Sequence, residues 1–306
     1  MSKRREELFA QGADAGCRLD LFLAGRLVEV SRKAIKRALD GGRVFVDGRV
    51  QRRANYPLRG EERVFLTLEG ENPPPTKPEL TILYRDEGLL AIDKPAGLPS
   101  HPTVAGRINA LDLVREVVAA GEGSENPILL HRLDGDTTGV LLFALHAEAN
   151  RDLARQFAQR QVEKTYLALV AGNPPDAFSV RNFLKAGVRG RTIAVTSGGL
   201  IAETHFRTLS RSRVFALVEA RPKTGRTHQI RAHLAGLGHP LLGDELYGGP
   251  TSLVLDGVCL RPRRHLLHAL SLRFFCPQKR DFLTVCAPVP EGFLPFWPAL
   301  SPVPDV

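Results

Sequence analysis

A proline-rich segment divides this sequence in two. ENPPPTKPE, residues 71–79, holds four prolines in nine positions. Proline lacks the backbone N–H that helices and sheets use, so closely spaced prolines favour an extended, semi-rigid spacer. The length of 306 residues also suggests two domains, at about 150 residues each. We therefore expect one domain over residues 15–72 and a second over residues 80–300.

Positive charge is concentrated in the first of these parts. The net charge of the chain is +9, and a surplus of this kind favours a polyanionic partner, either nucleic acid or an anionic membrane surface. Residues 32–53 contain eight Lys or Arg and two Asp, so six of the nine net charges lie in this window. A charged, solvated helix face is the simplest explanation, and a compact phosphate-binding surface is the alternative.

The same window predicts two helices followed by a hairpin. Residues 18–30 carry apolar side chains at helical spacing, and Ser31 is a typical N-cap for a second helix over residues 32–40. The Asp47-Gly48 pair within RVFVDGRV predicts a hairpin turn. The charged face of the second helix carries four basic residues, Arg32, Lys33, Lys36 and Arg37.

This helix–helix–hairpin pattern resembles the small alpha-L RNA-binding motif found in a ribosomal small-subunit protein. The resemblance covers roughly residues 16–70 and implies that Arg32, Lys33, Lys36 and Arg37 contact structured RNA. The motif performs no chemistry of its own.

The sequence indicates a cytoplasmic protein. The first 16 residues have no apolar stretch typical of a signal peptide, and the most apolar run, Val140 to Leu145, is far too short to span a membrane. The four cysteines lack CxxC spacing, so neither a zinc ribbon nor a disulfide framework is expected.

The chemistry of the second part centres on the loop HRLDGDTTG, residues 131–139, between two apolar, strand-like runs. Loops held by rigid strands commonly carry catalytic residues. By composition alone, Asp134 and Asp136 are most simply turn formers. A hydrolase with paired carboxylates is a weaker alternative, because side chains at i and i+2 need not face one reacting centre.

Other common sites have no support in the sequence. His228 and His233 are five residues apart, which is not the spacing of two helical metal ligands, so hydrogen-bonded structural histidines are expected. No phosphate-binding GxxxxGK[ST] loop and no GxGxxG motif after a strand is present. We therefore expect neither a metal nor a nucleotide cofactor.

Six motifs taken together resemble the RluA-type RNA pseudouridine synthases, and in particular those that modify large-subunit ribosomal RNA. They occur in the family's order and span roughly residues 80–275: AIDKPAGLPSHP, HRLDGDTTG, EKTYLALV, GRTHQIRAH, HPLLGDELYG and RRHLLHALSLRF. One departure is Thr137-Thr138-Gly139, where the family often has Thr-Ser-Gly, and the hydroxyl is retained.

The resemblance implies an α+β catalytic domain with a mixed, largely antiparallel central sheet, acting as a monomer without metal or cofactor. It implies that Asp134 is the reacting carboxylate and that Arg231 forms an ion pair with it. It also implies that Tyr166 stacks on the target base. It also implies substrate contacts for Leu267, His131 and Arg132. For Tyr166 and Leu267 the residues alone would favour ordinary core packing.

The implied reaction is the isomerisation of uridine to pseudouridine in RNA. We expect 23S ribosomal RNA as the substrate, with transfer RNA as the alternative. A non-catalytic RNA-binding protein for ribosome assembly, and a metal-dependent nucleic-acid hydrolase, are the competing hypotheses.

Overall fold

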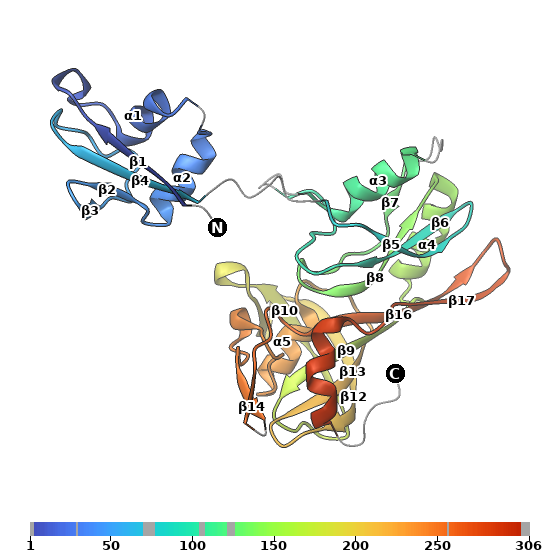
Figure 1. Cartoon of the computed structure of the whole chain (residues 1–306). Helices are drawn as coiled ribbons and strands as arrows, with labels where there is room; N and C mark the ends of the chain where they lie inside the picture. Colours follow the sequence, from blue (N-terminus) through green and yellow to red (C-terminus); the bar gives the residue numbers. More distant parts are fainter. Residues whose placement is uncertain are drawn as a thin grey trace. The chain divides into compact units, whose positions relative to one another are not determined.

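The structure is a computed structural model that divides into two compact units, Met1–Thr76 and Lys77–Val306 (Figure 1). The proline-rich segment lies largely outside the described residues, which resume at Lys77. None of the helices in the described part is long and apolar enough to cross a membrane. The described residues are 3–28, 30–69, 77–103, 108–120, 126–255 and 257–300.

The first unit packs two α-helices on a four-stranded antiparallel sheet of order β1-β4-β2-β3. Apolar residues of both helices, among them Leu23 and Ile35, meet Val44 and Leu66 of the sheet in one buried core. The elements are β1 (Lys3–Phe9), the 3-10 turn η1 (Gly12–Asp14), α1 (Leu19–Arg26), α2 (Arg32–Asp40), β2 (Val44–Val46), β3 (Arg49–Val50) and β4 (Arg63–Glu69).

The two helices and the hairpin that the sequence predicts are present. Ser31 caps α2, because its hydroxyl accepts a hydrogen bond from the Ala34 N–H at 3.2 Å. Asp47 and Gly48 both have positive φ, as a tight two-residue hairpin turn requires. The first helix is shorter than expected, since it ends at Arg26. Strand β1 lies before residue 15, the start that the sequence predicts for this domain, so the domain begins earlier than expected.

The second unit contains three α-helices and thirteen strands among its described residues. The strands are β5 (Thr81–Arg85), β6 (Leu89–Lys94), β7 (Ile128–Leu129), β8 (Thr138–Ala144), β9 (Glu163–Ala171), β10 (Ala177–Ala186), β11 (Thr192–Val195), β12 (Leu200–Arg211), β13 (Phe215–Pro222), β14 (Leu253–Leu255), β15 (Val258–Leu260), β16 (Leu267–Cys276) and β17 (Asp281–Cys286). The helices are α3 (Ala110–Ala120), α4 (Ala147–Ala158) and α5 (Gln229–Gly236), with 3-10 segments η2 (Val188–Gly190), η3 (Glu245–Tyr247) and η4 (Glu291–Ala299).

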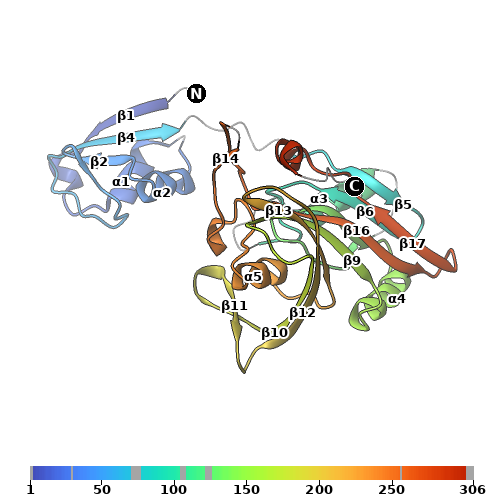
Figure 2. The ribbon, with the colours of Figure 1, turned by 90° about the horizontal axis from the view of Figure 1, so that it is seen from below.

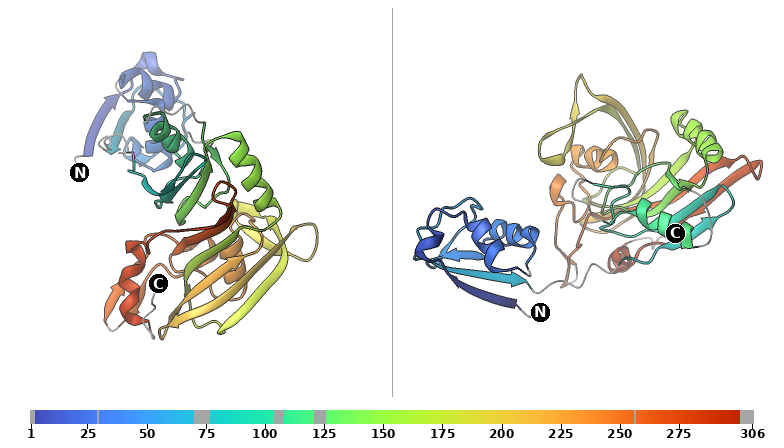
Figure 3. Two further views of the ribbon diagram at one scale, coloured as in Figure 1. Left: turned by 90° about the vertical axis from the view of Figure 1, so that its right-hand side faces the viewer. Right: turned by 90° about the horizontal axis from the view of Figure 1, so that it is seen from above.

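Eleven of these strands form one sheet with helices on both faces. Along β8, Leu141 and Phe143 pack on one face with α3, whereas Val140 and Leu142 pack on the other with Leu153 of α4. This alternation follows from the two-residue period of a strand. Helix α5 contacts β11 and β12, as Figure 2 shows, and shares a core layer with α3. Helix α4, light green in Figure 3, covers the other face.

One parallel contact makes this sheet mixed. Strand β16 pairs with β8 in parallel, with His268 opposite Thr138 and Ala269 opposite Gly139. The other strand pairs described in the sheet are antiparallel. The expected α+β fold with a mixed, largely antiparallel sheet is therefore confirmed.

Gly139 is essential to that parallel contact. Its φ is +107°, and a Cβ at this position would overlap the carbonyl oxygen of Ala269. Because the obstacle is backbone, no side-chain rotation can relieve it. The substitution Gly139→Ala should therefore cost about 2–5 kcal/mol of unfolding free energy, combining backbone strain and overpacking.

Urea denaturation followed by the fluorescence of Trp297, the single tryptophan and part of this unit, measures this loss. Gly236→Ala is the matched control, because Gly236 ends α5 with open space around its Cα. An unfolding midpoint for Gly139→Ala equal to that of the control would contradict the packing argument.

Candidate active site

The loop that carries Asp134 is held by a side chain on each side. The Ser100 hydroxyl donates to the carbonyl of Leu133 at 2.8 Å and accepts from the Leu133 N–H at 3.0 Å. The fully buried Lys94 ammonium donates to the carbonyl of Gly135 at 2.8 Å. The residues before and after Asp134 are thus both fixed by side chains from the end of β6 and the segment that follows it.

Lys94 is buried without an ion-pair partner among the described residues. Its other two N–H bonds go to the carbonyl oxygens of Pro95 and Leu98, both at 2.8 Å. All three donors of the ammonium are therefore used. Burial lowers the pKa of Lys94 to about 7, although the nearby Asp136 acts in the opposite direction. These hydrogen bonds connect the segment after β6 to the loop that carries Asp134.

Asp134 forms an ion pair with Arg231 of α5. Arg231 Nη1 donates to Asp134 Oδ2 at 3.1 Å, and Nε and Nη2 donate to the two carboxylate oxygens of Asp244 at 2.7 and 2.8 Å. Asp244 is 1% exposed, so this bidentate pair is buried. Burial alone would lower the pKa of Arg231, but the two carboxylates outweigh it and raise that pKa. The guanidinium is thus a fixed positive charge beside Asp134.

A tyrosine and a histidine complete this network. The Arg231 guanidinium lies over the Tyr247 ring, 5.0 Å from its centroid. The Tyr247 hydroxyl accepts from the Thr192 N–H at 2.7 Å and lies 3.2 Å from His228 Nδ1. His228 has a left-handed backbone at the start of α5, and its Nε2 lies 3.9 Å from Asp134 Oδ2. Burial lowers the pKa of His228.

The six cleft residues singled out in the sequence line one cavity of about 850 Å³, namely His131, Arg132, Asp134, Tyr166, Arg231 and Leu267. Tyr166 of β9 and Leu267 of β16 come from neighbouring strands and belong to the same core layer. Tyr166 is 8% exposed, and both burial and the charge of Asp134 raise its pKa. It is therefore a neutral phenol at physiological pH.

His131 and Arg132 differ in their surroundings. The His131 Nε2 accepts a hydrogen bond from the Leu142 N–H at 3.2 Å, and its ring stacks on Phe157. Burial lowers the pKa of His131 to about 3, so it stays neutral. Arg132 is exposed and makes no hydrogen bond or ion pair with the described residues. His131 thus forms a wall of the cavity, whereas Arg132 is free to meet a ligand.

Both threonines of the Thr137-Thr138-Gly139 sequence bond buried histidines. Thr137 Oγ1 lies 2.9 Å from His265 Nε2, and Thr138 Oγ1 lies 2.9 Å from His268 Nδ1. The second threonine therefore uses its hydroxyl in a bond to a buried histidine. These bonds join the end of the Asp134 loop to the start of β16.

The four basic residues expected to contact RNA lie on α2 of the first unit. All four are exposed, and none has an ion-pair partner in the described part of the chain: Arg32, Lys33, Lys36 and Arg37.

Three residues of the site were missed as functional candidates. Asp244 and Tyr247 lie within HPLLGDELYG and Lys94 within AIDKPAG, motifs that carried the resemblance without a role for these residues. His228 and His233 were both expected to be structural. His233 has a structural role, because it is buried and forms hydrogen bonds with Thr204 and Asn182. His228 instead faces Asp134.

Four largely buried histidines predict a pH-dependent stability. Burial lowers the pKa of His131 to about 3 and those of His233, His265 and His268 to about 4. Their unfolded pKa is about 6.5, so at pH 5 the unfolded chain binds more protons than the folded chain. The contribution of these histidines to stability is therefore constant above pH 7. It lowers stability as the pH drops from 6.5 towards 4, by up to about 1.4 kcal/mol per pH unit for each histidine.

Urea midpoints from Trp297 fluorescence at pH 7.5, 6 and 5 test this expectation. His233→Gln should flatten the dependence, and replacement of the exposed His205 by Gln is the control. A midpoint that stays constant from pH 7.5 to 5 would rule out the neutral buried histidines.

Comparisons with known proteins agree with this architecture. Residues 88–236 match the RNA pseudouridylate synthase family, and residues 17–64 match the S4 domain. A ribosomal large subunit pseudouridine synthase D from Xylella fastidiosa is 36% identical over 97% of this chain and 92% of its own length. An uncharacterized RNA pseudouridine synthase from Aquifex aeolicus is 35% identical over 90% of this chain and 91% of its own.

A solved structure shows the same catalytic fold. The human RNA pseudouridylate synthase domain containing 4 protein superposes with a TM-score of 0.57 at 28% identity, covering 70% of this chain and 90% of its own. The shared motifs, the fold and the relatives lead to one conclusion. This chain belongs to the RNA pseudouridine synthases and carries an N-terminal S4 domain.

Proposed function

We propose that this chain converts uridine to pseudouridine in 23S ribosomal RNA, with Asp134 as the reacting carboxylate. The observation that carries the proposal is that Asp134, Tyr166 and Arg231 meet in one cavity of a pseudouridine synthase fold. Several relatives are named ribosomal large subunit pseudouridine synthase D, which favours ribosomal over transfer RNA.

The reaction makes and breaks bonds without a net change in atoms. The base leaves the sugar, rotates, and rejoins it through a ring carbon. That carbon then loses a proton, and the ring nitrogen released from the sugar gains one. Asp134 either attacks the sugar covalently or removes a proton from it. Neither route requires a redox step, so the proposal includes no redox cofactor. It also takes the protein to be a monomer that works without a metal ion.

Arg231 keeps Asp134 ready for this task. The guanidinium supplies both a positive charge and a hydrogen bond to the carboxylate. Asp244 holds the guanidinium in place by two charge-assisted hydrogen bonds. The carboxylate is therefore held in one orientation in a partly buried cavity.

The remaining residues of the cavity would receive the base and its neighbours. The Tyr166 ring offers a flat surface for stacking and Leu267 an apolar contact. A uridine inside folded RNA must leave its stack to reach Asp134, at a cost of a few kcal/mol. Arg132 is placed to fill the gap or to bind a phosphate, while His131 closes the cavity wall.

Asp134→Asn should abolish pseudouridine formation while RNA affinity stays within about twofold of wild type. The amide keeps the size of the carboxylate but loses its charge and its nucleophilicity. Chemical mapping of pseudouridines in total RNA, from cells with and without the gene and from cells carrying the variant, measures the change. A parallel assay with purified protein in EDTA, without added cofactor, tests the cofactor-free mechanism.

The same mapping separates the alternatives. Loss of a pseudouridine in transfer RNA would replace the ribosomal assignment. Full activity of Asp134→Asn would disprove the role of this carboxylate. Unchanged maps after loss of the gene would favour a non-catalytic role in ribosome assembly.

The basic face of α2 should supply affinity without affecting the chemical step. Replacing Arg32, Lys33, Lys36 and Arg37 together by Gln should weaken RNA binding and reduce the salt slope, by about 0.7–0.9 for each phosphate that the protein no longer neutralises. Filter binding to transcribed 23S RNA over a range of salt concentrations measures both. The matched control exchanges Lys and Arg at the same four positions, and an unchanged slope for the Gln variant would exclude RNA binding by this face.

A further inference from the structure

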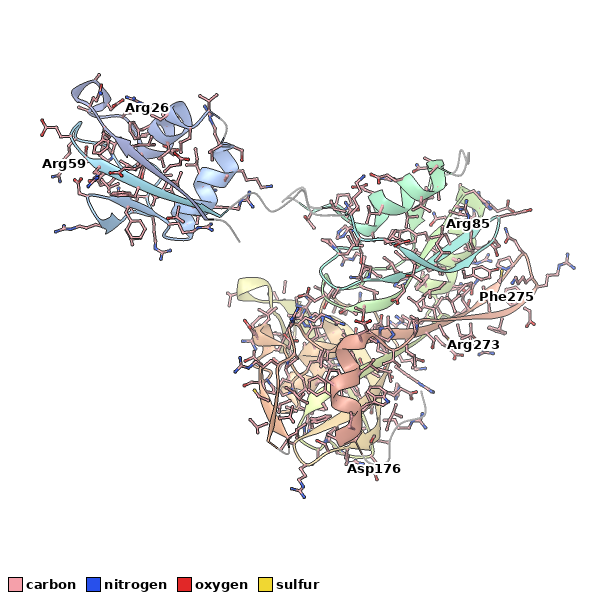
Figure 4. The ribbon with its side chains drawn as sticks, viewed as in Figure 1. Arg26, Arg59, Arg85, Asp176, Arg273 and Phe275 are labelled. Carbon is pink, nitrogen blue, oxygen red and sulfur yellow. The ribbon has the colours of Figure 1, made fainter. Side chains whose placement is uncertain are left out.

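Lys164 is a cavity residue to which neither the sequence nor the proposed reaction gives a role. It precedes Tyr166 by two positions on β9, so both side chains emerge on the same face of the sheet, about 7 Å apart along the strand. Both line the cavity. The preceding residue, Glu163, forms an ion pair with Arg273 of β16. Arg273 is labelled in Figure 4.

The ammonium of Lys164 has no ion-pair partner in the part of the chain that the structure describes. Its one hydrogen bond to the described residues is a long contact of 3.5 Å to the Thr224 carbonyl. Burial, together with the positive charge of Arg160, lowers the pKa of Lys164 to about 8. Lys164 is only partly buried. Removing a cation even partly from water without a counter-charge is costly, so its placement favours an anionic ligand.

The turn beside this ammonium presents further donors. Gly225 and Thr227 make no hydrogen bond with the described residues, so their backbone N–H groups are open at the start of α5. A Cβ built on Gly225 would lie 3.8 Å from Lys164 Nζ, which places the backbone of the turn next to the ammonium. Arg226 adds a second positive charge to the same part of the cavity wall.

We propose that Lys164 and the turn 224–227 form a binding site for one phosphate of the RNA backbone beside the target uridine. The inference rests on the proposed function, because a base on Tyr166 with its sugar at Asp134 leaves the flanking phosphates near the cavity mouth. Phosphate matches the donors present: an ammonium, open amides and the positive end of a helix. The site would fix the nucleotide after it leaves the stack.

Salt dependence tests whether Lys164 binds a phosphate. Lys164→Gln should lower the salt slope for binding to transcribed 23S RNA by about 0.7–0.9, the value for one phosphate contact. Lys164→Arg keeps the charge and should keep the slope. Lys185→Gln is the control, because Lys185 is exposed on β10 and does not line the cavity. A slope for Lys164→Gln equal to that of the control would overturn the proposal.

A neutral phosphate analogue locates the contact. RNA fragments carrying the mapped uridine are made with a single methylphosphonate on its 5′ or 3′ side. One of the two should weaken binding to wild type at least fivefold, yet leave the affinity of Lys164→Gln unchanged. Equal sensitivity of both proteins at both positions would show that Lys164 touches no flanking phosphate.

The outcomes for the two proposals can be distinguished. If mapping finds no pseudouridine that depends on this chain, the proposed function fails, while the salt slope on transcribed 23S RNA still tests the phosphate site. If Lys164→Gln slows pseudouridine formation with an unchanged slope, Lys164 acts only within the protein and the phosphate site is wrong.

Discussion

The buried ion pair between Arg231 and Asp244 is the interaction on which the site depends. Breaking such a pair by removing one partner typically costs about 3–5 kcal/mol, because the remaining charge is left without compensation. Here the pair also has a directional effect. Asp244 uses Nε and Nη2 of the guanidinium, which leaves Nη1 aimed at Asp134. A lysine at position 231 could neutralise one carboxylate but could not hold both in this geometry.

The fold brings this pair to Asp134 through contacts between distant parts of the chain. Lys94 and Ser100 hold the residues around Asp134 from one side, and His265 reaches Thr137 from the other. Each of these contacts joins segments that are far apart in the sequence. The loop owes its position to side chains that bond its backbone and its hydroxyls, so its own turn-forming residues are only part of the reason for its shape.

The predictable part of the structure was local, or carried by a family motif. The cap at Ser31 and the turn at Asp47-Gly48 follow from short-range preferences, and both are present. The family resemblance predicted a common site for Asp134, Tyr166 and Arg231, and the three residues line one cavity. The roles of Asp244 and Lys94 could not be predicted from the sequence. An Asp after Gly is most simply a turn former, and only tertiary contacts bury it against Arg231.

The position of β16 in the sheet sets the order in which the protein can be completed. This strand, Leu267–Cys276, lies between β9 and β8 and joins the strands on either side into one sheet. During synthesis the strands from β5 to β13 emerge first, yet they cannot form the continuous sheet until β16 leaves the ribosome. The segment around the start of β16 supplies Leu267 of the cavity, His265 that bonds Thr137, and Ala269 that pairs with Gly139. These residues are available only after this segment has been synthesised. A chain interrupted before residue 267 would therefore carry the S4 domain and Asp134 but no assembled cavity, so the capacity to bind RNA precedes the capacity to modify it.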